Sequence, residues 1–396
     1  MAIVRTMRQE DIEDVADLTA RIFAEPAERE ATAALMRAAY ESCPSMPTDL
    51  CFVAEDQGRI VAKWQILDFQ MWIAGVPVRM GGVQAVAAEP NENHKGYAKQ
   101  VALAAIPQVA EMGFDLVIGF AQRGAFYRRL GAVVVAAEYE IEFDISGVPR
   151  LRDDPFSPWQ ESRDLERSIE LYNQANSEGT GPLIRSVELW PWLVRKSAVT
   201  FVCEAGYVAL NVYPDIVEIR EIAGEGPAFH DAALRKAAEV ARDTGAGRLV
   251  GMMPPNHPMV QIALPYGLKV RADYPRKSGC IGLHLSPIRL IGRLREVLER
   301  RIALSRHADT QLELTLHGPS EQESWVINPN GHELKKAALT LPGGEWLKLA
   351  LGHTSIASII QAYPGAYEGP IDSDDLDRLE TLFPVGHPFM WHTDRY

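Results

Sequence analysis

The sequence predicts a mixed α+β protein made of three successive units. Its 396 residues are enough for two or three domains, each with its own hydrophobic core. Residues 1–150 read as two helices, a strand meander and a strand–loop–helix–strand segment, and residues 151–285 repeat this order in a weaker form. In residues 286–396 an amphipathic helix precedes a strand hairpin and further helices. Helices and strands therefore occur together in every unit.

The overall composition is that of a globular protein with an acidic balance. Hydrophobic residues make up 47% and charged residues 23% of the chain. The formal net charge of −13 argues against a nucleic-acid-binding surface, which needs a basic face. Two explanations of the acidity stay open. It either serves solubility alone or creates a field that attracts a cationic acceptor.

The cysteines and the N-terminus point to a reducing compartment. The four cysteines lie at positions 43, 51, 203 and 280. They form no Cys-x-x-Cys pair and have no histidines at zinc spacing, so we expect free thiols and no metal site. Residues 1–14 lack the apolar region of a signal peptide, and no run of about 18 apolar residues follows. We therefore expect a cytoplasmic protein that does not span a membrane.

The first unit begins with a recognisable order of elements. A strand is expected at 3–5, and a helix follows with Ile12, Val15 and Leu18 on one face. A second helix covers 27–40, and strands at 50–54 and 60–69 flank a glycine turn.

The stretch from Gly81 to Ala132 carries the most specific pattern. An apolar strand leads into a polar loop, a helix and a second apolar strand. The loop residues are Asn93, His94, Lys95, Gly96, Tyr97 and Ala98. A loop that enters a helix N-terminus offers free backbone N–H groups, to which Gly96 and Ala98 give close access and Lys95 adds positive charge. This favours a pyrophosphate site; the alternative is a solvated loop before an ordinary helix.

The second unit repeats the order without such a loop. After a proline-bearing linker at 151–162, strands, the helix 229–244 and the strand 249–253 follow. The next residues read Pro-Pro-Asn-His-Pro, and proline lacks the N–H group that a phosphate needs. We interpret this unit as one that has lost cofactor binding.

Two segments of the first unit resemble the GNAT acetyltransferases. The loop is similar to their Arg/Gln-x-x-Gly-x-Gly/Ala motif, with Asn93 where Arg or Gln is usual, and Phe126 to Gly131 resembles their Tyr-x-x-x-Gly segment. The resemblance implies acetyl-CoA as co-substrate and Tyr127 as the general acid that protonates the leaving thiolate. It also implies that the strand around Val86, Ala87 and Ala88 binds the thioester and the pantetheine arm. Alternatively, Tyr127 is a packing residue.

The whole chain resembles the "enhanced intracellular survival" (Eis) subgroup. The segment LPGGEWLKLALGHTSIASII and the ending LFPVGHPFMWHTDRY are similar to the sterol-carrier-like C-terminal domain of that subgroup. The resemblance implies an active GNAT domain at 1–150, a degenerate GNAT-like domain at 151–285 and a sterol-carrier-like domain at 286–396. It further implies a homo-oligomer, namely a hexamer.

The general base is expected at the far end of the chain. The strand 80–88 contains no acidic residue, and its Gln84 is neutral. In Eis-like proteins the carboxylate of the last residue serves as base, which is Tyr396 here. A chain end is normally frayed, but Phe389, Trp391 and Tyr396 favour a packed tail.

The sequence therefore predicts an N-acetyltransferase acting on a primary amine. An aminoglycoside-like compound, a polyamine and a lysine side chain all remain open as acceptors. Glu25 and Glu28 are candidate acceptor-binding acids by resemblance, unless they are solvated helix charges. One alternative is an acyl-CoA or apolar-ligand sensor without turnover. Another is an acyltransferase that uses a longer acyl-CoA.

Overall fold

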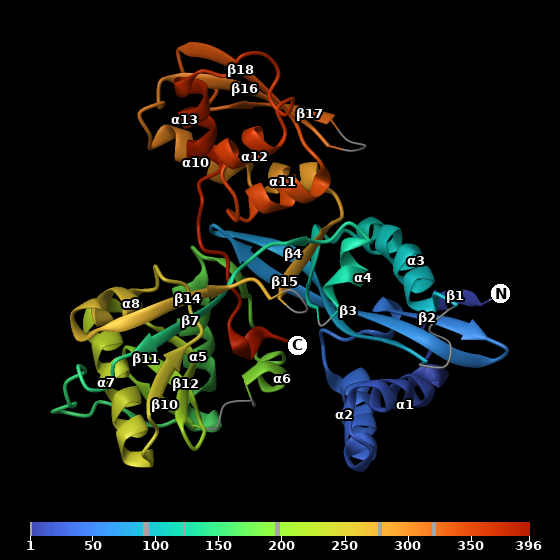
Figure 1. Ribbon diagram of the computed structural model, residues 1–396, viewed down its shortest axis with the longest axis vertical. Coiled ribbons are helices and arrows are strands. Elements are labelled where there is room, and N and C mark those ends of the chain that lie inside the picture. Colours follow the sequence, from blue (N-terminus) through green and yellow to red (C-terminus); the bar gives the residue numbers. More distant parts are fainter. Residues whose placement is uncertain (1, 90–94, 122, 195–198, 276–278, 319–321) are drawn as a thin grey trace.

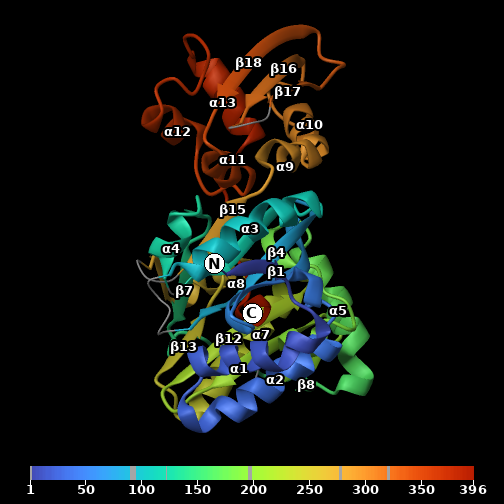
Figure 2. The same ribbon diagram turned by 90° about the vertical axis from the view of Figure 1, so that its right-hand side faces the viewer.

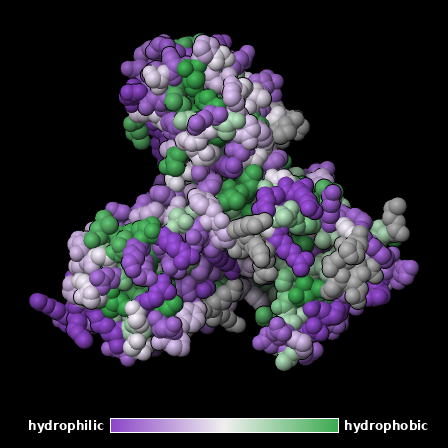
Figure 3. Space-filling view, viewed as in Figure 1, coloured by the Kyte–Doolittle hydropathy of each residue, from purple (hydrophilic) through white to green (hydrophobic). Residues whose placement is uncertain are grey.

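The molecule has three lobes that meet near its middle (Figures 1 and 2). The computed structural model describes residues 2–89, 95–121, 123–194, 199–275, 279–318 and 322–396. Within these residues the strands form two large sheets and one small sheet, and helices pack against all of them. The predicted mixed α+β class is confirmed. We call the lobes the first, central and third units, and in space-filling view they remain distinct (Figure 3).

The sheet of the first unit has the strand order β1-β2-β3-β4-β5-β15-β6, and β9 pairs with β3. Its strands are β1 (Ile3–Thr6), β2 (Cys51–Asp56), β3 (Arg59–Ile73), β4 (Val76–Ala88), β5 (Leu116–Phe120), β6 (Val133–Val134), β9 (Thr180–Leu183) and β15 (Cys280–His284). The helices are α1 (Ile12–Phe23), α2 (Arg29–Ser42), α3 (Tyr97–Glu111) and α4 (Gly124–Arg128). One buried cluster joins the sheet to α1 and α2, and a second cluster joins it to α3.

The central sheet has the order β14-β7-β13-β12-β11-β10-β8. Its strands are β7 (Glu138–Phe143), β8 (Ser157–Pro158), β10 (Val199–Cys203), β11 (Gly206–Val212), β12 (Ile216–Gly224), β13 (Arg248–Gly251) and β14 (Leu268–Asp273). The helices of this unit are α5 (Glu161–Asn176), α6 (Trp190–Val194), α7 (Gly226–Thr244) and α8 (Pro258–Ala263). The segment β11-β12-α7-β13-α8 repeats the order β3-β4-α3-β5-α4, as expected for a second unit of the same type.

The two large sheets exchange a strand. β7 lies between β13 and β14 of the central sheet, although it follows β6 directly in sequence. β15 lies between β5 and β6 of the first sheet, although it follows β14. The division into 1–150, 151–285 and 286–396 remains a prediction about stretches of sequence. The two large sheets share strands across the boundary between the first two stretches.

The third unit surrounds a small sheet of order β17-β16-β18. Its elements are β16 (Thr310–His317), β17 (Gln322–Ile327), β18 (Glu333–Thr340), α9 (Pro287–Arg293), α10 (Arg295–Ala303), α11 (Gly343–Ala350), α12 (Ile356–Ala362) and α13 (Ser373–Leu382). Alternate residues of β16 are buried, as a strand with one covered face requires. Trp346 and Phe383 fill the interior beside them.

The C-terminal tail, residues 384–396, leaves the third unit and descends between the other two (Figure 1). Phe389 continues the edge formed by β9, since its N–H donates to the carbonyl of Thr180. Trp391, Thr393 and Asp394 are buried. The tail is therefore packed rather than frayed.

Candidate functional site

β4 and β5 form a fork in the first sheet. They pair in parallel over Met80–Gly82 and then diverge, while β4 continues to Ala88. β4 also carries one extra residue opposite β3, and Ala85 has a positive φ of 43°. On one edge of β4, Ala87 and Ala88 pair with β3. On the opposite edge, β4 makes no pair with β5 beyond Gly82 among the described residues.

The N-terminus of α3 lies beyond β4. Its N-cap is Gly96, which has a φ of 69° and open space around the position of a side chain. The following N–H groups of Tyr97 and Ala98 have no partner within the helix, because they belong to its first turn. Lys95 lies 3.7 Å from Asp56, which also accepts a hydrogen bond from the Tyr97 hydroxyl. Asn93 and His94 lie outside the described residues.

Tyr127 lies on α4, the short helix that follows β5. Its ring stands edge-on to Phe126 at 5.0 Å between centroids. Burial raises the pKa of the Tyr127 hydroxyl to about 12, so it keeps its proton at neutral pH. The side chain packs on the same hydrophobic cluster as Val86 and Ala88 of β4.

Tyr396 reaches the fork from the end of the chain. Its hydroxyl donates to the carbonyl oxygen of Ile118 at 2.7 Å, and its ring lies 5.1 Å from that of Phe69. A Cβ atom on Gly82 would lie 2.7 Å from the Tyr396 ring, so only glycine leaves room for the ring here. Burial raises the pKa of the Tyr396 hydroxyl well above its usual range, and the ring acts as an apolar anchor.

The two tyrosines approach the first sheet from different sides. Tyr396 packs on the cluster that includes α1 and α2, and Tyr127 packs on the cluster that includes α3. The fork lies between these two clusters.

A buried ionic cluster holds the tail just before Tyr396. The Arg185 guanidinium donates to Asp394 at 2.9 Å and to Glu221 at 3.0 Å. All three side chains have no exposed surface, and the hydroxyls of Tyr172 and Tyr207 complete the hydrogen bonds. Burial raises the pKa of Asp394, and the charge of Arg185 opposes this. Sequence reasoning missed these residues, because nothing near Arg185 in the chain marks it.

The acidic acceptor candidates lie between the first two helices. Glu25 precedes the short 3₁₀ turn Pro26–Glu28 between α1 and α2, Glu28 is its last residue, and both side chains are exposed. Among the described residues, no hydrogen bond or ion pair joins either one to Tyr127 or Tyr396. Their proposed role depends on the resemblance alone.

The glycine-loop comparison for the central unit needs a correction. The Pro-Pro-Asn-His-Pro segment follows β13 and so corresponds to the segment after β5, not to the loop before α3. The true counterpart is Glu225–Gly226, between β12 and α7, where Gly226 has a φ of 79°. β12, and not β13, is the strand that corresponds to β4.

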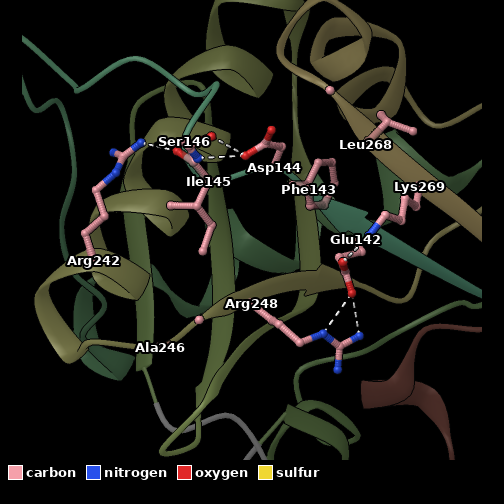
Figure 4. Close-up of a pocket in the computed structure, with 12 residues that line it drawn as sticks. Glu142, Phe143, Asp144, Ile145, Ser146, Arg242, Ala246, Arg248, Leu268 and Lys269 are labelled. Carbon is pink, nitrogen blue, oxygen red and sulfur yellow. Dashed lines mark hydrogen bonds and ion pairs between the residues drawn. The ribbon is translucent and has the colours of Figure 1, made fainter.

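A cavity of about 700 Å³ lies elsewhere, in the central unit (Figure 4). It opens where α7 ends and β13 and β14 begin. β13 diverges from β12 at its other end, so the cavity lies away from that divergence. Its basic groups already have partners, since Arg248 and Lys269 both bond to Glu142 and Arg242 donates to the backbone carbonyls of Ile145 and Val148. We assign no reaction to it.

Neither a metal-binding group nor a membrane-spanning helix is found in the described part of the chain. Its His, Cys, Asp and Glu side chains form no group of three or more that could hold a metal ion. Its helices include none that is both long and apolar enough to cross a membrane.

Comparisons with known proteins agree with this geometry. Residues 3–135 match the family described as "Acetyltransferase (GNAT) domain". Comparison with curated proteins gives no match. The first unit is thus a GNAT acetyltransferase domain, a fold that supports acyl transfer from acyl-CoA.

Solved structures resemble the chain over its whole length. A GCN5-related N-acetyltransferase from Kribbella flavida is 18% identical, with 100% of this chain and 98% of that chain covered and a TM-score of 0.75. A GCN5-related N-acetyltransferase from Anabaena variabilis ATCC 29413 is 14% identical, with both chains fully covered and a TM-score of 0.73. Eis1 from Mycobacterium abscessus is 13% identical, again with full coverage of both, and has a TM-score of 0.67. At these identities the likeness concerns the fold.

Proposed function

We propose that the protein is an acetyl-CoA-dependent N-acetyltransferase of the Eis type that transfers acetyl directly to a primary amine. The acceptor belongs to one of three classes: aminoglycoside-like compounds, polyamines or lysine side chains. The main support is the position of Tyr396, the last residue, whose ring packs against Gly82 and Phe69 at the fork. An exposed chain end normally frays, so its burial beside a GNAT fork supports a role in the reaction.

The first unit offers groups that fit acetyl-CoA. We assign the thioester and pantetheine arm to the unpaired edge of β4 at Val86–Ala88. The pyrophosphate is assigned to the loop of Asn93, His94 and Lys95 and to the N-terminus of α3, where the helix dipole favours an anion. The left-handed backbone at Gly96, with no atom within 4 Å of the place that a Cβ would take, supports close approach of a phosphate.

The reaction needs one proton acceptor and one proton donor. The carboxylate of Tyr396 accepts a proton from the acceptor ammonium, directly or through water, and the free amine attacks the thioester carbonyl. A C–N bond forms, and the tetrahedral intermediate collapses as the C–S bond breaks and the nitrogen releases its second proton to solvent. Tyr127 then gives its proton to the departing thiolate and recovers one from solvent. The approach of the two tyrosines from different sides of the sheet supports this division of roles.

Amine-dependent thiol release tests the proposal. The protein is mixed with acetyl-CoA and a panel of aminoglycosides, polyamines and lysine peptides, and free thiol is followed. We expect release that requires an amine and falls about 10²-fold or more in Tyr127→Phe, with acetyl-CoA affinity unchanged. Acetyl-CoA binding without release across the panel would favour a sensor. Faster release from longer thioesters would favour another acyl group.

The pH profile gives a separate check on Tyr127. A general acid must be protonated, and activity that depends on it is lost only as the pH rises through its pKa of about 12. We therefore expect kcat to stay level up to about pH 10, well below that pKa. If kcat instead falls as the pH rises toward 10, and this fall disappears in Tyr127→Phe, the assignment of an unusually high pKa to Tyr127 is contradicted.

The remaining features of the proposal follow the Eis resemblance. We assign the third unit to the sterol-carrier-like class, Glu25 and Glu28 to the acceptor side, and the assembly to a homo-hexamer. Light scattering after gel filtration measures the mass of the assembly. A monomeric mass would remove the hexamer from the proposal.

A further inference from the structure

The central sheet contains a second fork, built like the first. β12 and β13 pair in parallel over Ile216–Ile219, and β12 then continues to Gly224 paired with β11 but not with β13 among the described residues. β12 carries one extra residue at Arg220, as β4 does near Ala85. The helix that follows each of these strands begins at a glycine with a positive φ. The central unit thus keeps the backbone form of an acyl-CoA site.

The C-terminal tail occupies this second fork. His392 hydrogen-bonds to Glu218 at 2.7 Å, and its carbonyl accepts a hydrogen bond from Arg220 at 3.2 Å. The hydroxyl of Thr393 donates to Glu221, which lies past the last pair between β12 and β13. On the other side, the ring of Trp391 meets that of His257, a residue that follows β13, at 5.7 Å. The tail therefore lies between the two diverging strands.

Arg185 locks the tail in the fork. It lies just after β9 in sequence and hydrogen-bonds both to Asp394 in the tail and to Glu221 in β12. Buried charges are costly unless they are paired, so each partner fixes the position of the others. Tyr396 follows Asp394 by two residues, a span of at most about 7 Å. A shift of Asp394 would therefore move Tyr396 in the first fork.

We propose that the central fork is a docking site for the chain's own C-terminal tail, and that Arg185 is the positioning residue that fixes Tyr396 at the first fork. The former cofactor cleft holds a peptide of the same chain in place of an acyl-CoA. The docking follows from the contacts of the tail. Its effect on turnover rests on the proposed function of the Tyr396 carboxylate.

Release of the last residue measures the docking directly. Carboxypeptidase A removes Tyr396 from the full-length chain only when the tail leaves both forks. We compare the parent with Asp394→Asn, which removes the charge that faces Arg185 but keeps the shape, and with Trp391→Ala. Asp273→Asn, which breaks an exposed ion pair with Arg271, is the matched control. We expect Tyr396 to be released at least tenfold faster in both tail variants and at the parental rate in the control.

Turnover is measured on the same proteins. We expect the tail variants to lower kcat while the affinity for acetyl-CoA stays the same, since the first fork itself is intact. If Trp391→Ala lowers the Tm far more than the control does, Asp394→Asn decides the result. Unchanged release of Tyr396 in Asp394→Asn would overturn the docking, whatever happens to turnover. Faster release with unchanged turnover would support the docking and remove the Tyr396 carboxylate from the proposed mechanism.

Discussion

The first and central sheets have the same strand pattern, but their forks differ in what they hold. At the first fork, β4 beyond Gly82 stays paired with β3 but not with β5 among the described residues, and the ring of the last residue packs against Gly82. At the central fork, residues 391–394 bond to β12 and pack against His257. The same backbone form thus accommodates one aromatic ring in the first sheet and a longer segment of the tail in the central sheet.

The difference lies in side chains rather than in backbone. The central fork has a set of ionic and hydroxyl groups around Arg185 that match the polar groups of the tail. The first fork is lined by Phe69, Phe120 and a glycine, which accommodate one aromatic ring. The side chains of the central fork therefore hold the tail at the place that corresponds to the proposed acyl-CoA site of the first fork.

Extension of the chain beyond Tyr396 should have the largest effect on turnover. Two glycines added after Tyr396 remove the carboxylate from its position but leave the central contacts of the tail in place. We expect kcat to fall by about 10²- to 10⁴-fold, which is the usual contribution of a general base. Turnover is measured by thiol release and acetyl-CoA binding by calorimetry. Parental turnover in the extended chain would exclude the carboxylate as the base.

A matched pair of glycine substitutions should separate the two helix N-termini. Gly96→Asp places a negative charge at the start of α3, and Gly226→Asp does the same at the start of α7. Both glycines have a positive φ and open surroundings, so the backbone strain is similar. We expect Gly96→Asp to weaken acetyl-CoA binding by roughly tenfold or more, because it repels the pyrophosphate. A comparable loss in Gly226→Asp would mean that the central unit also binds the cofactor.

Gly82→Ala tests the fit of Tyr396 at the first fork. The new methyl group would lie 2.7 Å from the Tyr396 ring and 2.9 Å from Phe69, so the ring must move. Overpacking of this kind costs about 1–3 kcal/mol, and we expect kcat to fall about threefold to tenfold. Gly247→Ala, with nothing within 4 Å, is the control. Equal kcat values in the two variants would contradict the proposed position of the ring during turnover.

The smallest expected effect concerns acid stability. Burial, with His230 as a second cause, lowers the pKa of His257 to about 3, so the folded protein holds this ring neutral against Trp391. An unfolded histidine binds a proton below about pH 6.5, so this contribution is complete above that pH and is lost as the pH falls toward 3. Between pH 7 and 5 we expect a loss of up to about 2 kcal/mol.

Calorimetric Tm values at pH 7 and pH 5 measure this loss. The control is His257→Asn, which can still accept a hydrogen bond from the N–H of Met259 but does not titrate. Its Tm should fall less between the two pH values than that of the parent. An equal fall in both proteins would assign the acid sensitivity to other groups.

The elements of the first unit could be predicted because their signals are local. Apolar spacing marked α1, and the glycine before Tyr97 marked the start of α3. The Arg185–Asp394 contact joins residues 209 positions apart, and neither residue has a neighbour that marks it as buried. The place of Tyr396 at the fork was inferred from a family resemblance, since no spacing in the sequence relates it to Gly82.

The exchange of β7 and β15 could not be predicted either. Both segments are short and mix β-forming residues with residues that strands disfavour, namely Glu in β7 and Gly in β15, so neither carries a local signal for one sheet. Their choice depends on tertiary pairing with β5 and β13, which sequence pattern alone does not encode.

The exchanged strands also set the order in which the protein can be made. During synthesis the first sheet lacks β15 until the chain has grown past His284, so β5 has an open edge while the whole central unit is being produced. Unpaired strand edges are the usual route to aggregation, and long-range pairing is slow. The N-terminal unit therefore cannot mature first, as most N-terminal domains do. The first sheet must therefore close last, after every strand of the central sheet has been produced.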